Sequence, residues 1–153
     1  MSVLDDTRPG ARRGDLECTI HPFGSLGSYV FVVVVSEYNG RLMLSRHKKR
    51  ATWETQGGHI EPGEAPMEAA GRELREESGA KVYKLTPVCD YYGYNEFGSA
   101  NGCVFHAEIT EMGDMPESEM AETALFDNMP DELTYPKVTP KLVNEARRLM
   151  RRV

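Results

Sequence analysis

Three glutamates are spaced so that they could act together on a metal ion. Glu73, Glu76 and Glu77 lie at offsets of three and four residues, which in a helix places all three carboxylates on one face. Glu61 and Glu64 lie a short distance upstream in a glycine-rich segment. Clustered carboxylate oxygens suit Mg²⁺ or Mn²⁺, which usually retain waters and bind substrate phosphates as well. The pattern indicates a candidate divalent-metal site.

The same acids also fit a solvent-exposed helix face that carries ion pairs. Like charges four residues apart destabilise a helix by about 0.2–0.5 kcal/mol per pair. Arg72 and Arg75 could offset part of this repulsion. On residue types alone, both interpretations stay open.

The elements around these acids can be predicted from local patterns. A helix is expected over residues 66–78, because Pro66 suits the first helical position and Gly79 suits the C-terminal cap. Its apolar stripe comprises Met67, Ala70 and Leu74. Asn39 and Gly40 predict a tight hairpin turn, since both tolerate positive φ.

The remaining elements complete a mixed α/β chain. Strands are expected at residues 16–23, 29–36, 41–46, 82–94, 102–109 and 123–126, and a second helix at 139–152. In the strand 41–46, Leu42 and Leu44 alternate with Arg41 and Met43, so one buried face is expected. Residues 98–102 are expected to form a turn. This order predicts an α/β/α sandwich around a mixed β-sheet, with a loose arm at residues 1–15 and a single domain at 16–153.

Composition excludes several classes of protein. The 153 residues, 40% hydrophobic and 27% charged, are typical of one soluble domain. No apolar run is long enough to span a membrane, and the first fourteen residues lack a signal-peptide pattern, so a cytoplasmic protein is expected. Cys18, Cys89 and Cys103 are widely spaced, which favours buried free thiols.

Charge is unevenly distributed along the chain. The net charge is −6, and residues 85–136 contain eleven acids but no lysine or arginine. Such a stretch argues against a surface for duplex nucleic acid, which requires basic faces. It is either solvated surface or negative potential near a cation site.

Residues 58–80, which include the three clustered glutamates, closely resemble the Nudix box, G-x5-E-x7-R-E-U-x-E-E-x-G-U, in which U is a bulky aliphatic residue. The one departure is Ala80 at the last position. The matching positions are Gly58, Glu64, Arg72, Glu73, Leu74, Glu76, Glu77 and Gly79.

The resemblance implies Mg²⁺- or Mn²⁺-dependent hydrolysis of a nucleoside diphosphate linked to another group. It makes Glu73, Glu76 and Glu77 metal ligands, together with the main chain of Gly57. Residue by residue, it also gives structural roles to Gly58, Glu64, Arg72 and Gly79. The catalytic residues would then be Glu76, Glu77 and a carboxylate that accepts a proton from the attacking water.

That base lies either in the box, as Glu76, or in the acidic segment 116–122. Glu117, Glu119 and Glu122 are the candidates there, with Glu119 favoured. The basic run 46–50 is either a solvated loop or a phosphate clamp. If it is a clamp, Arg46, Lys48 and Arg50 bind the substrate. The single tryptophan, Trp53, is expected to pack in the core rather than stack on a base.

Four functions remain in competition. The favoured one is hydrolysis of an NTP or dNTP, including an oxidised one such as 8-oxo-dGTP, to the monophosphate and pyrophosphate. The others are an ADP-ribose or nucleotide-sugar diphosphatase, an enzyme acting on the triphosphate end of RNA, and a non-catalytic nucleotide-binding module. The sequence does not distinguish a monomer from a homodimer.

Overall fold

The computed structural model describes residues 12–151. The arm expected at residues 1–15 therefore falls mostly outside the described residues, and its end forms a short 3-10 turn, η1 (Arg13–Asp15). No helix within 12–151 is long and apolar enough to cross a membrane.

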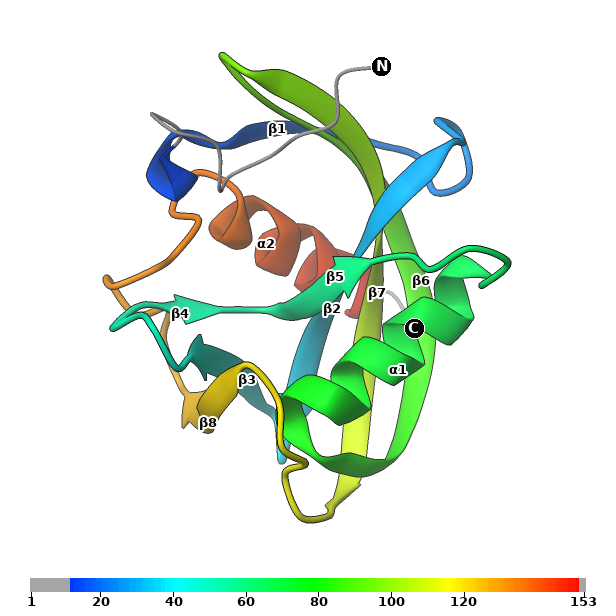
Figure 1. The fold of residues 1–153 in the computed structure, drawn as a ribbon. Coiled ribbons are helices and arrows are strands. Elements are labelled where there is room, and N and C mark those ends of the chain that lie inside the picture. Colours follow the sequence, from blue (N-terminus) through cyan, green and yellow to red (C-terminus); the bar gives the residue numbers. More distant parts are fainter. Residues whose placement is uncertain (1–11, 152–153) are drawn as a thin grey trace.

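A mixed sheet forms the centre of the molecule (Figure 1). Its strands are β1 (Glu17–His21), β2 (Tyr29–Tyr38), β3 (Arg41–His47), β4 (Trp53–Glu54), β5 (Gln56–His59), β6 (Ala80–Asn95), β7 (Gly98–Met112) and β8 (Met120–Phe126). Their order is β1-β6-β7-β2-β3-β4, with β5 paired to β2 and β8 paired to β3. β2 and β7 run parallel, and the other paired strands run antiparallel.

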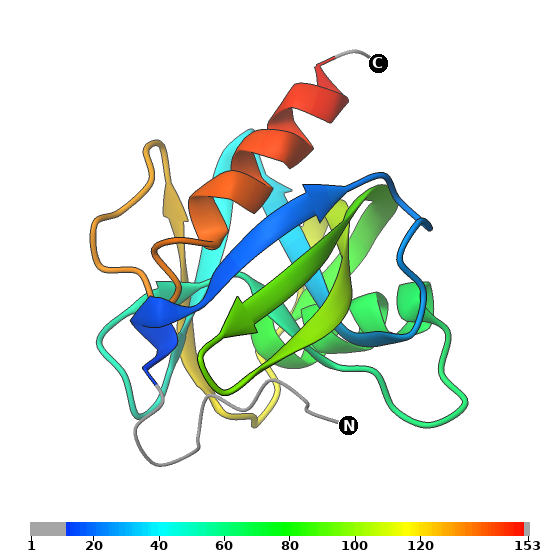
Figure 2. The same cartoon turned by 90° about the horizontal axis from the view of Figure 1, so that it is seen from above.

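Two helices cover opposite faces of this sheet, α1 (Pro66–Ser78) and α2 (Thr139–Met150) (Figures 1 and 2). Leu74 of α1 packs in a buried cluster with Val34. Leu142 of α2 packs in a second cluster with Val35, the next residue of β2. Because neighbouring strand residues point to opposite faces, one strand contributes to both cores. The α/β/α architecture is confirmed.

The ends of α1 lie where local sequence places them. Pro66 occupies the first turn, and Glu68 accepts a hydrogen bond from the Ala65 N–H at 2.9 Å, which satisfies a donor that the helix leaves open. Gly79 ends the helix at φ +79°, a conformation that glycine adopts without steric cost.

Three local expectations are wrong. Met67 is 46% exposed, because it lies outside the stripe that contacts the sheet. Met43 is buried like Leu42 and Leu44, since it packs in the cluster on the α1 side of the sheet while they pack in the cluster on the α2 side. Residues 98–102 belong to β7, because the Asn95 side chain accepts hydrogen bonds from the N–H groups of Phe97 and Gly98 and the chain turns there instead.

Other expectations are confirmed. Cys18, Cys89 and Cys103 are free and buried. Trp53 packs edge-on against Phe126 with the ring centroids 5.1 Å apart. Asn39 and Gly40 both have positive φ in the turn between β2 and β3.

Candidate active site

The double glycine of β5 brings the backbone directly against the carboxylates of α1. The Gly57 N–H donates to Oε1 of Glu77 at 2.8 Å. A Cβ on Gly57 would overlap the carbonyl oxygen of Val32, and a Cβ on Gly58 would lie 2.7 Å from Oε1 of Glu73. At position 57 the obstacle is backbone, so only glycine fits, and at position 58 a side chain would displace the Glu73 carboxylate. These two glycines therefore let Glu73 and Glu77 lie against the strand.

Arg72 connects the loop before α1 to the acidic face of the helix. Its Nε and Nη2 bind the two oxygens of Glu64 at 2.8 and 2.9 Å. Nη2 also donates to the His59 carbonyl at 3.0 Å. Nη1 reaches Glu73 at 2.8 Å and Glu76 at 3.4 Å. This guanidinium lowers the pKa of Glu64 to about 2 and has its own pKa raised in return.

Glu77 has the most strongly raised pKa among the carboxyl groups of this site. Burial raises the pKa of its carboxyl to about 9, even though the Gly57 N–H favours the ionised form. The carboxylates of Glu73, Glu54 and Glu119 raise this pKa further. Burial also raises the pKa of Glu73. The site therefore holds ionisable carboxyl groups that lack sufficient positive charge around them.

The chemistry of this donor set fits a divalent cation. The candidate ligands are the oxygens of Glu73, Glu76 and Glu77 and the nearby carbonyl of Gly57, all hard donors. In the described part of the chain, no group of three or more His, Cys, Asp or Glu side chains is already arranged to hold a metal. Glu73 and Glu76 bind Arg72 instead. The Glu76 side chain is 52% exposed, so it is not locked in by packing.

The raised pKa of Glu77 has a consequence for stability without metal. Between the usual glutamate value near 4.5 and about 9, the folded chain holds a proton that the unfolded chain has lost. Stability therefore falls as pH rises through this window. Glutamine does not titrate, so Tm measured in chelator for Glu77→Gln minus Tm for the native chain should increase from about pH 5 to about pH 9. A difference independent of pH would contradict the buried state of Glu77.

A cleft of about 750 Å³ adjoins this carboxylate cluster. One part of its wall is polar and contains Gly57, Gly58, Glu54, Glu77, His47, Arg50 and Glu119. Another part is apolar and lies beside α2, with Leu16, Phe31, Tyr91, Val138 and Leu142. Volume and lining are typical of a site for one small molecule with a charged end and a planar or apolar end.

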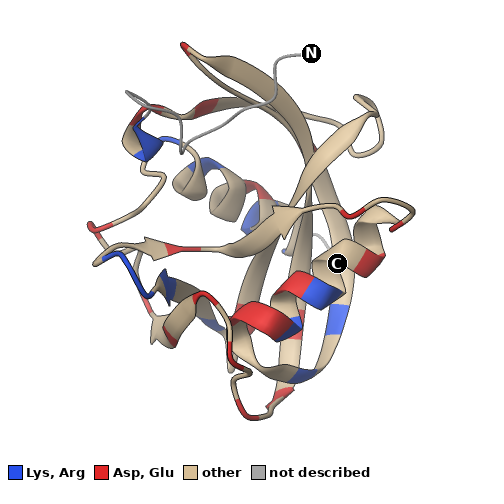
Figure 3. Cartoon of the chain, viewed as in Figure 1, with Lys and Arg blue, Asp and Glu red and all other residues tan. Residues whose placement is uncertain are grey.

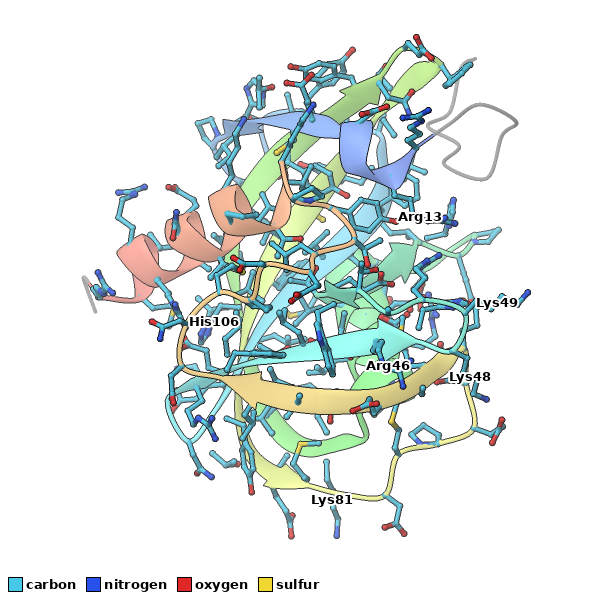
Figure 4. The ribbon with its side chains drawn as sticks, turned by 90° about the vertical axis from the view of Figure 1, so that its left-hand side faces the viewer. Arg13, Arg46, Lys48, Lys49, Lys81 and His106 are labelled. Carbon is cyan, nitrogen blue, oxygen red and sulfur yellow. The ribbon has the colours of Figure 1, made fainter. Side chains whose placement is uncertain are left out.

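The structure separates the three basic residues that were expected to bind substrate. Arg50 lines the cleft, where its Nη1 lies 3.0 Å from both oxygens of Glu54. Arg46 binds Glu122 at 2.7 Å and the Arg50 carbonyl at 3.0 Å. Lys48 binds Glu117 at 2.6 Å near the tip of the β3–β4 loop (Figure 4). Only Arg50 among them therefore faces the cleft.

The three candidates for the proton-accepting base also separate. Glu119 lines the cleft, 3.7 Å from Nε2 of His47, and its backbone carbonyl accepts from the Lys48 N–H at 2.9 Å. Glu117 and Glu122 pair with Lys48 and Arg46. Acidic residues lie along both α1 and the β7–β8 loop (Figure 3), and Glu119 is close enough to raise the pKa of Glu77. Part of the acidic stretch therefore does lie near the candidate metal ligands.

The comparison with known proteins decides the family. The sequence matches the NUDIX domain over residues 26–151. The chain belongs to the Nudix family. It is thus a Nudix hydrolase, a pyrophosphohydrolase by family, and its residues 58–80 are a Nudix box.

Related Nudix proteins carry two different substrate names. The Bacillus subtilis protein YtkD, named for 8-oxo-dGTP diphosphatase activity, is 29% identical over 76% of this chain and 72% of its own length. An ADP-ribose pyrophosphatase of the same organism is 30% identical over 80% of this chain and 67% of its own length. The crystal structure of the B. subtilis pyrophosphohydrolase BsRppH has a TM-score of 0.69 at 23% identity, covering 90% of this chain and 87% of that one. That likeness supports the Nudix fold.

Several cleft residues of this Nudix domain were not found from the sequence. Glu54 and His47 line the polar part, and Arg13 and Tyr135 line the apolar part. Arg13 extends from η1, which is far from the box in sequence (Figure 4). His47 offered a signal, because it stands in the basic run directly after a strand. The other residues carry no local pattern and come together only through the fold.

Proposed function

We propose that this Nudix hydrolase cleaves a nucleoside triphosphate or deoxynucleoside triphosphate, oxidised or canonical, to the monophosphate and pyrophosphate, using Mg²⁺ or Mn²⁺. One observation carries the proposal. A single cleft joins the buried carboxylate of Glu77, the guanidinium of Arg50 and an apolar wall beside α2. A nucleoside triphosphate presents a matching order of groups, with a polyphosphate at one end and a planar base at the other.

The metal would be held by Glu73, Glu76 and Glu77 with the backbone oxygen of Gly57. When bound, the cation supplies charge neutralisation for the phosphates and a lowered pKa for the attacking water. Arg72 keeps Glu64 and Glu73 fixed between loop and helix, so that the carboxylates keep their spacing. The acidic cluster would repel a polyphosphate if no cation were there.

Glu119 would accept the proton of the attacking water. Its carboxylate is 83% exposed at the cleft, where a water molecule can reach it. The Lys49 N–H donates to Nδ1 of His47 at 3.1 Å, which leaves Nε2 as the protonated nitrogen facing Glu119. The separation of 3.7 Å between Nε2 and the Glu119 carboxylate is longer than a hydrogen bond, so the carboxylate stays open to a water molecule in the cleft.

Arg50 would bind the outer phosphates. Replacing it by lysine keeps the charge but removes the planar fork, so KM for the triphosphate should rise roughly tenfold. Lys81→Ala is the control, since Lys81 lies at the lower edge of the molecule in Figure 4, outside the lining of the cleft, and its KM should stay within about twofold. A comparable rise in KM for Lys48→Ala would instead assign phosphate binding to the β3–β4 loop.

ADP-ribose is the second candidate substrate, because the related ADP-ribose pyrophosphatase matches this chain as well as YtkD does. The test is release of phosphate and pyrophosphate from canonical and oxidised nucleotides, ADP-ribose and dinucleoside polyphosphates with Mg²⁺ or Mn²⁺. We expect pyrophosphate from a triphosphate and none in chelator. Cleavage of ADP-ribose alone would establish the second candidate. Metal binding without turnover of any of these compounds would contradict both candidate substrates.

A further inference from the structure

A network of buried polar side chains lies under the C-terminal half of α1. It consists of Ser36 on β2, Ser45 on β3 and Gln56 on β5, all with no exposed surface. All three lie on the sheet face that α1 covers, among residues such as Val34 and Met43. Buried polar groups in a core cost free energy relative to apolar ones unless they are fully hydrogen-bonded. Their bonding therefore needs a structural explanation.

The hydrogen bonds of this network run in one direction, from Ser36 to the backbone of Glu77. Ser36 Oγ donates to Oε1 of Gln56 at 2.6 Å, and Nε2 of Gln56 donates to Oγ of Ser45 at 2.9 Å. Nε2 also faces the Met43 carbonyl at 3.4 Å, which fixes the orientation of the amide because a flipped oxygen would meet another acceptor there. Ser45 is left with its own proton to donate, and it donates to the carbonyl of Glu77 at 2.9 Å.

That final acceptor belongs to the central residue of the candidate site. The carbonyl of Glu77 is one of the last four of α1, which have no partner inside the helix. The carboxylate of the same residue accepts from Gly57, the neighbour of Gln56. Glu77 is therefore held at both ends, by Ser45 through its backbone and by β5 through its side chain. The contacts close a ring through Gln56, Gly57, Glu77 and Ser45.

We propose that Ser45 is a positioning residue, which together with Gln56 fixes the end of α1 so that the Glu77 carboxylate stays at the metal position. The inference rests on the proposed role of Glu77 as a metal ligand. Ser45 itself touches neither metal nor substrate, and acts through the backbone of Glu77. Removing its hydroxyl leaves the Glu77 carbonyl and one Gln56 proton without a partner, so the last turn of α1 can shift against β5.

The test compares Ser45→Ala with Ser36→Ala by titrating Mn²⁺ and following the electron paramagnetic resonance signal of the free ion. Ser36 is as deeply buried and belongs to the same network, but its hydroxyl donates to Gln56 and not to α1. We expect both variants to lose similar thermal stability. Ser45→Ala should weaken Mn²⁺ binding roughly tenfold, as is typical for residues that orient metal ligands, and Ser36→Ala should change it less than about threefold.

A second pair keeps the test decisive if alanine at position 45 prevents folding. Ser45→Thr keeps the hydroxyl and Ser45→Val has the same shape without it, so any crowding is equal in both. Thr should retain Mn²⁺ affinity and Val should lose it. Equal Mn²⁺ affinity in both members of each pair would overturn the positioning role. Failure of the native chain to bind Mn²⁺, or unchanged binding in Glu77→Gln, would instead overturn the proposed metal site.

Discussion

Glu77→Gln is expected to reduce kcat roughly a thousandfold, because metal-assisted stabilisation of the transition state is worth several kcal/mol. Glutamine keeps the size of the side chain and can still accept the Gly57 N–H. It carries no negative charge, however, and does not have to be desolvated as an ion. The variant should therefore fold, and above neutral pH without metal it should unfold at a higher temperature than the native chain.

The matched control for this variant is Glu68→Gln on the same helix. Glu68 accepts a hydrogen bond from the Ala65 N–H at the first turn of α1, which glutamine can also do. Its kcat should remain within about twofold of the native value. Near-native turnover of Glu77→Gln at saturating Mg²⁺ would show that Glu77 does not hold the cation.

Glu119→Gln is expected to reduce kcat by about 10²–10⁴-fold, the usual contribution of a positioned general base. KM and Mn²⁺ affinity should change little, since Glu119 is assigned to the proton and not to the metal. Steady-state kinetics together with a Mn²⁺ titration separate these effects. The result distinguishes a base in the β7–β8 loop from one inside the Nudix box.

Glu117→Gln on the same loop and Glu122→Gln on the adjoining strand β8 serve as controls. Both carboxylates are exposed and pair with residues of β3 or the β3–β4 loop, outside the lining of the cleft. Each should leave kcat within about threefold, because exposed ion pairs contribute little. If Glu119→Gln behaves like these two, Glu76 becomes the remaining candidate for the base.

Local sequence was sufficient to predict α1 and the acids on it. Pro66 and Gly79 mark the ends of the helix, and the offsets between Glu73, Glu76 and Glu77 determine which face they share. These features depend on residues within one or two turns. The strand at 29–36 could also be predicted from local sequence, because β-branched residues favour extended structure.

The wall of the cleft could not be predicted, because its residues are distant in sequence. Arg50 faces the cleft and Lys48 does not, although they are two residues apart. The difference arises from Glu54 and Glu117, of which the second lies on a loop 69 residues away from Lys48. Alternation along β3 likewise does not predict that Met43 is buried, because a local pattern does not reveal packing on the second face of a strand.

The identity of the phosphate product tests the central claim most directly. A triphosphate that the protein turns over with Mg²⁺ should yield pyrophosphate and the nucleoside monophosphate in equal amounts, with no release in chelator and nearly none from Glu77→Gln. Release of orthophosphate and a nucleoside diphosphate, or turnover that persists in Glu77→Gln, would contradict hydrolysis at the Glu77 site.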